Sequence, residues 1–91
     1  MPLFTVLMEF KGGTYLSQLR APSPDAALET WARDLDVKNI EGMTETVKRQ
    51  FVEWLPEARP MVVDGLKSTW SSGFVTRADS ALVHIVRTPD R

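Results

Sequence analysis

The sequence predicts a two-layer α+β protein, in which two helices cover one face of a four-stranded antiparallel sheet. Three observations predict this fold class. Apolar residues alternate with other residues near both ends of the chain, a period that is typical of strands. In the middle of the chain they recur every three or four positions, as on the buried face of a helix. The resulting order, ββααββ, groups hairpins and helices separately, which favours an antiparallel sheet with helices on one side.

The first two strands form a predicted β-hairpin. Residues 3–10 are rich in β-forming side chains, and residues 14–20 provide the returning strand. Gly12 and Gly13 between them are expected to form the turn, because glycine adopts positive φ without steric cost. A two-residue turn at these glycines predicts the following register: Lys11 with Thr14, Phe10 with Tyr15, Met8 with Ser17 and Val6 with Leu19.

Alternation along the strands divides this hairpin into two faces. One face carries the larger apolar side chains and is expected to lie under the helices; it consists of Phe4, Val6, Met8, Phe10, Tyr15 and Leu19. The opposite face mixes aliphatic and polar side chains, namely Leu3, Thr5, Leu7, Glu9, Leu16, Gln18 and Arg20.

The first helix is predicted from about Pro24 to Leu35. Ser23 is a favourable N-cap, proline suits the first helical position, and Asp25 lies where the helix dipole favours an anion. The apolar stripe of this helix consists of Ala27, Leu28, Trp31, Ala32 and Leu35.

The second helix is predicted after a polar connection, residues 36–43, in which Ile40 turns inward through one short helical turn. Thr44 can cap this helix and Pro56 ends it, because proline interrupts the helical hydrogen bonds. Its buried stripe consists of Val47, Phe51, Trp54 and Leu55.

The final third of the chain is predicted to be β-structure. Residues 66–75 alternate small polar residues with aromatic ones, and residues 81–86 are apolar on both faces. A short extra strand near Met61 is compatible with the turn signal of Asp64 and Gly65 that follows it. Since the first and last strands are apolar on both faces, they are expected at the centre of the sheet. The predicted strand order is therefore 2-1-4-3, with the serine-rich strand at an edge.

Two helices can cover only one face of this sheet, so the aliphatic residues of the other face remain open. The last strand adds either Leu82 and Val86, or Val83 and Ile85, to that face, and alternation alone leaves both choices open. A contiguous aliphatic patch of this kind is rarely left exposed on a monomer. We therefore expect a homodimer whose interface consists of Leu3, Leu7, Leu16, Leu82 and Val86, with His84 and Arg20 at its margin.

The composition excludes several kinds of chemistry. The 91 residues include no cysteine and one histidine, so disulfides, thiolate sites and multi-histidine metal sites are excluded. His84 lies in a strand among aliphatic residues, where a structural role is the simpler interpretation; on an open face it would respond to pH. Asp34, Asp36 and Glu41 could collect a cation, but no glycine-bearing calcium loop accompanies them. The serines around Trp70 match no nucleophile motif. We predict no enzymatic activity, no cofactor and no metal.

The charge balance argues against nucleic acid as the main partner. The chain has 11 basic and 12 acidic residues, and residues 25–57 carry a net charge of −4. A protein that holds a phosphate backbone usually has a clear basic excess. Rings of Tyr15, Trp70 and Phe74 could nevertheless stack on bases, which keeps nucleic-acid binding as the alternative function. The basic residues on or beside the predicted strands are Arg20, Lys67, Arg77 and Arg87.

Residues 5–35, a hairpin followed by Ser-Pro-Asp-Ala-Ala-Leu at the start of a helix, resemble small bacterial antitoxin domains of the HicB type. They lack the Pro-Asp-Leu-Pro-Gly-Cys stretch of those domains, whose plan has no second helix, so no residue role is carried over. No apolar run approaches the roughly 20 residues that span a bilayer, and no secretory signal is recognisable. We expect a single cytoplasmic domain, residues 1–91, that acts as a small binding or regulatory module whose partners are a second copy and other proteins.

Overall fold

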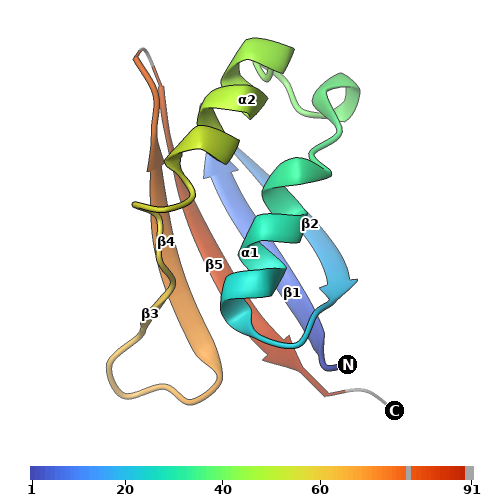
Figure 1. The fold of residues 1–91 in the computed structure, drawn as a ribbon, viewed down its shortest axis with the longest axis vertical. Coiled ribbons are helices and arrows are strands. Elements are labelled where there is room, and N and C mark those ends of the chain that lie inside the picture. The colour runs from blue at the N-terminus through green and yellow to red at the C-terminus, as the bar shows by residue number, and fades with distance from the viewer. Residues whose placement is uncertain (78, 90–91) are drawn as a thin grey trace.

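The computed structural model describes residues 1–77 and 79–89, and it has an α+β fold with an antiparallel sheet and two helices. Both helices lie on the same face of the sheet (Figure 1). The elements in chain order are β1 (Leu3–Phe10), β2 (Gly13–Arg20), α1 (Pro24–Arg33), a 3-10 helix η1 (Val37–Asn39), α2 (Glu45–Trp54), β3 (Met61–Val62), β4 (Thr69–Val75) and β5 (Ser80–Thr88).

The sheet has five strands in the order β2-β1-β5-β4-β3, so the predicted number of four strands was wrong, whereas the four strands of the predicted order 2-1-4-3 keep their predicted neighbours. The additional strand β3 pairs antiparallel with β4 through Met61 with Ser71 and Val62 with Trp70. The element order is therefore ββααβββ instead of ββααββ, and the serine-rich β4 is not the edge strand. A strand of two residues is too short to show alternation, and it forms only because β4 offers it a partner.

The turn between β1 and β2 consists of Lys11 and Gly12, and not of Gly12 and Gly13 as predicted. These two residues have φ values of 48° and 80°, which a type I′ turn requires at both central positions. Phe10 consequently pairs with Gly13 and not with Tyr15, and every predicted pair is shifted by two residues. Because side chains alternate with a period of two, this shift leaves each side chain on its predicted face.

Packing of Tyr15 explains why residue 13 is glycine. A Cβ atom at Gly13 would lie 2.8 Å from the Tyr15 hydroxyl oxygen, so a side chain there would displace the ring. The same hydroxyl oxygen accepts a hydrogen bond from the Glu41 backbone N–H at 3.2 Å, which ties β2 to the segment before α2.

Aromatic rings form the centre of the core between the helices and the sheet. The Phe51 ring of α2 meets Phe10 edge-on, with centroids 6.0 Å apart, and Phe74 at 5.1 Å. Trp31 of α1 meets Phe74 edge-on at 5.6 Å. These contacts join both helices to β1 and β4, and such ring pairs stabilise by about 0.5–1.5 kcal/mol beyond their buried area.

The structure also decides which side of β5 faces the helices. Val83 and Ile85 are fully buried in the core, together with Ala81. Leu82 and Val86 therefore lie on the opposite face, which is the first of the two choices that the sequence left open.

Both predicted helix caps are present. The Ser23 hydroxyl accepts a hydrogen bond from the Ala26 N–H at 3.1 Å, and the Thr44 hydroxyl accepts one from the Val47 N–H at 3.1 Å. Ile40, in the connection between the helices, is buried as expected. Within residues 1–77 and 79–89, no helix has the length and apolarity needed to cross a bilayer.

Candidate functional site

The candidate functional site is the face of the sheet opposite the helices, called the open face below. Leu7 of β1 lies at its centre, between Leu16 of β2 and His84 of β5. The same register pairs Leu3 with Arg20. Along β5, the predicted residues Leu82, His84 and Val86 alternate with the buried residues Ala81, Val83 and Ile85. All seven predicted interface residues are therefore on the open face: Leu3, Leu7, Leu16, Leu82, Val86, His84 and Arg20.

The apolar side chains of the open face are unusually accessible for their size. Leu16 is 67% exposed, Leu82 is 45% exposed and Val86 is 39% exposed, whereas Leu3 and Leu7 are half-buried between their neighbours. Leu16 pairs directly with Leu7, and Leu82 and Val86 flank His84 on the next strand, so these residues form one aliphatic patch around Leu7 that is interrupted by Thr5, Glu9 and His84.

Two further apolar residues of the open face were missed by the sequence analysis. Met61 of β3 is 71% exposed and pairs with Ser71, which pairs in turn with His84. Val75 at the end of β4 is 53% exposed and shares this face by alternation. The sequence could not place Met61 on this face, because a two-residue strand shows no alternation of apolar and polar side chains. Only its pairing with β4 shows which way Met61 faces.

His84 lies in a central row of the open face, and not at its margin as predicted. Its Nε2 atom is 3.7 Å from the Glu9 carboxylate oxygen Oε2, and its side chain is about one-third exposed (34%). The two groups form an ion pair only when the imidazole is protonated. Arg20 does lie at the margin, where its guanidinium donates to the backbone carbonyl of Met1 at 3.0 Å.

Two of the polar side chains that the sequence offered for other chemistry, Asp36 and Ser72, have structural roles. Asp36 caps η1, because its carboxylate accepts from the Lys38 N–H at 3.1 Å and from the Asn39 amide. No group of three or more histidine, aspartate or glutamate side chains within residues 1–77 and 79–89 is arranged to hold a metal ion. Ser72 is buried and donates from its hydroxyl to the Ala58 carbonyl at 2.7 Å.

The aromatic rings proposed for stacking on bases do not lie on the open face. Phe74 is fully buried, and Tyr15 and Trp70 pack against the core on the helix side of the sheet. Arg20, on the open face, has none of these three rings beside it, whereas Arg87 pairs with Phe4 and lies on the helix side of the sheet, as Trp70 does. A nucleic-acid interface on the open face would therefore have none of these three rings on which to stack bases.

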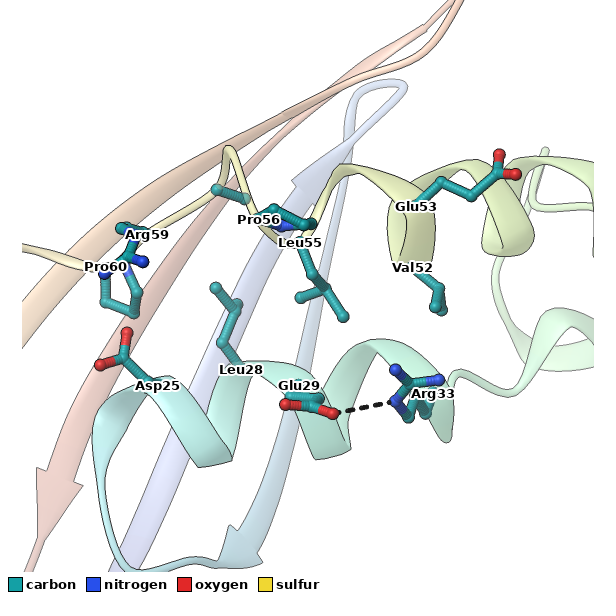
Figure 2. A pocket seen from close by; sticks show the side chains of 11 residues that line it. Asp25, Leu28, Glu29, Arg33, Val52, Glu53, Leu55, Pro56, Arg59 and Pro60 are labelled. Atoms are coloured by element: carbon teal, nitrogen blue, oxygen red, sulfur yellow. Dashed lines mark hydrogen bonds and ion pairs between the residues drawn. The ribbon is translucent and has the colours of Figure 1, made fainter.

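A hollow of about 620 Å³ lies between the two helices, on the side away from the open face (Figure 2). Its floor is apolar, with Leu28 of α1 and Leu55 after α2 pointing toward one another. On its rim the Arg33 guanidinium is paired with Glu29 at 3.2 Å. A rim whose opposite charges pair with each other in solvent is typical of a solvated helix surface.

A second hollow, of about 530 Å³, lies beside β2 on the helix side of the sheet and is called the β2 groove below. Its apolar lining residues come from four elements or their connections: Met8, Tyr15, Leu16, Leu19, Trp31, Leu35 and Ile40. Its polar lining includes the carboxylates of Asp34 and Asp36 and the amide of Asn39. Neither hollow is lined by His84 or Glu9.

The fold and the open face together define a two-layer α+β protein with an uncovered, partly aliphatic sheet surface. No family model, curated protein or solved structure matches the chain. Function is therefore inferred from the geometry of the open face and of the sheet edges.

Proposed function

We propose that this protein is a non-enzymatic binding module that self-associates through the open face of its sheet. The observation that carries the proposal is the aliphatic patch around Leu7, in which Leu16 remains 67% exposed. Burying apolar surface stabilises an association by about 25 cal/mol per Å² before the costs of association are subtracted. Two-fold pairing of identical faces is the commonest arrangement of soluble oligomers.

The size of the open face suits a dimer. The strands β1, β2, β3, β4 and β5 have 8, 8, 2, 7 and 9 residues; at a rise of about 3.3 Å per residue and about 4.8 Å between strands they present a surface of roughly 540 Å². A stable interface buries about 800 Å² per partner, which is of the same order. Two such sheets would pack about 10 Å apart with their strands rotated by about 30°, as in a β-sandwich.

The solution mass tests this proposal, measured by light scattering and by sedimentation equilibrium at about 100 μM, well above the Kd of a stable dimer. We expect a dimer for the unmodified chain and a monomer for Leu16→Lys, because a charge at the interface would be desolvated without a partner. Leu66→Lys is the matched control, since Leu66 is also exposed (54%) but lies in the turn between β3 and β4. A monomeric unmodified chain, or a control that dissociates equally, would overturn the proposal.

A further inference from the structure

The outer edge of β2 presents hydrogen-bonding groups that the sheet does not use. The Ala21 N–H donates to the Pro2 carbonyl at 3.2 Å, and this pair continues the register of β1 with β2. Odd-numbered residues of β2 therefore bond to β1, because paired residues alternate in an antiparallel ladder. The N–H and C=O groups of Thr14, Leu16 and Gln18 consequently point away from the sheet.

The two edges of the sheet differ in how they are protected. On the far side, β3 has two residues, follows Pro60, and is flanked by the buried bond from Ser72 to the Ala58 carbonyl. Prolines and very short edge strands block the addition of a further strand. β2 has eight residues, pairs without a bulge and contains no proline, and its one charged residue, Arg20, is its last. It therefore has none of these protections along its length.

The β2 groove runs beside this outer edge on the helix side. Side chains of a strand added to β2 would alternate between the open face, next to Leu16, and this groove. The lining of the groove is apolar where Trp31 and Leu35 contribute to it and acidic at Asp34 and Asp36. A lysine or arginine suits such a site, because its aliphatic stem covers apolar surface while its charged end reaches the carboxylates.

A second copy of the chain does not supply suitable side chains. If β2 of another copy added to this edge, the residues entering the groove would be its own Tyr15, Ser17 and Leu19. Tyr15 and Leu19 already pack against the core of their own chain, and Ser17 is small and polar. Such a pairing would also bring a second Asp34 and Asp36 close to the first pair, and like charges repel.

We propose that the outer edge of β2 binds an extended peptide as an additional antiparallel strand, with basic side chains in the β2 groove and aliphatic side chains on the open face. Backbone hydrogen bonds to Thr14, Leu16 and Gln18 provide affinity, and the alternating side chains provide selectivity. Asp34 provides the charge selectivity, because Asp36 is already engaged in capping η1.

The test uses a fluorescent heptapeptide with capped ends that alternates valine and lysine, and it measures affinity by anisotropy at low salt. In the proposed pairing the valines share the face of Leu16 and their N–H groups point to β2, whereas the lysine N–H groups point outward. N-methylation of the valines is expected to weaken binding at least about tenfold, and N-methylation of the lysines to leave it nearly unchanged. Equal affinity of the three peptides would overturn the proposal, as would stronger loss from lysine methylation.

Two pairs of protein variants test the same site from the other side. Gln18→Pro removes one outward N–H and is expected to weaken binding roughly fivefold, whereas Gln18→Ala loses the same side chain and keeps the N–H. Asp34→Asn is expected to reduce the preference for the lysine peptide over its valine–glutamate counterpart by roughly threefold. Unchanged affinity of Gln18→Pro for the lysine peptide, with the fold of the variant verified by circular dichroism, would contradict the proposal. If this variant does not fold, the comparison of the N-methylated peptides tests the proposal instead.

Leu82→Lys separates this inference from the proposed self-association. The substitution places a charge on the open face at β5, two strands away from β2, so it should dissociate the dimer and leave peptide affinity unchanged. If Gln18→Pro instead lowers the mass of an oligomer that persists in Leu82→Lys, a second copy occupies the β2 edge and the peptide proposal is wrong.

Discussion

Substitution of an open-face leucine by alanine should weaken self-association in proportion to the fraction of the leucine that is exposed in the isolated chain. Complete burial of a leucine side chain stabilises by about 2 kcal/mol. At 67% exposure, Leu16 therefore gains about 1.3 kcal/mol per copy from a partner that covers it. In a two-fold dimer the residue counts twice, and alanine retains a part of the contact. We expect Leu16→Ala to cost about 2 kcal/mol of dimerisation free energy, which raises Kd by roughly 30-fold.

The same reasoning gives a graded series with its own control. Leu82 is 45% exposed, so Leu82→Ala should raise Kd by only about tenfold. Leu66→Ala removes an exposed leucine outside the open face and should leave Kd within about twofold. The assay is sedimentation equilibrium over a dilution series, with circular dichroism to verify the fold. A reversed order of Leu16 and Leu82, or an equal effect of Leu66→Ala, would refute the assignment of the interface.

Three further substitutions test the fold on the Leu82→Lys background, where unfolding is not coupled to association. Phe51→Ala should lower the free energy of unfolding by about 3–5 kcal/mol, measured by urea titration of tryptophan fluorescence, because the ring is fully buried. Ser72→Ala should cost about 1–3 kcal/mol by the same titration, since the buried Ala58 carbonyl loses its donor. Gly12→Ala should cost about 1–2 kcal/mol in thermal unfolding, because φ is 80° there; a neutral result would contradict the turn at Lys11 and Gly12.

Local patterns were sufficient wherever the controlling interaction lies close in the chain. Ser23 and Thr44 cap their helices as predicted, because a cap bonds to a backbone N–H three residues later. The faces of β1 and β2 were predicted although their register was not, because a shift of two residues preserves alternation. The turn itself was misplaced because two adjacent glycines favour a turn at both positions, whereas the positive φ values fall at Lys11 and Gly12, and Gly13 is instead the glycine that the Tyr15 ring packs against.

The sequence by itself determined the two-layer α+β class, the caps and the set of side chains that share the open face, because periodicity and capping act over a few residues. Only the tertiary structure decided that the possible short strand near Met61 pairs with β4 as a fifth strand, that Val83 and Ile85 are buried in preference to Leu82 and Val86, and that His84 has a central place. It alone also assembled the β2 groove, whose lining comes from both strands of the hairpin, from α1 and from the segment around η1. These features depend on pairings between segments far apart in the chain, which local patterns do not specify.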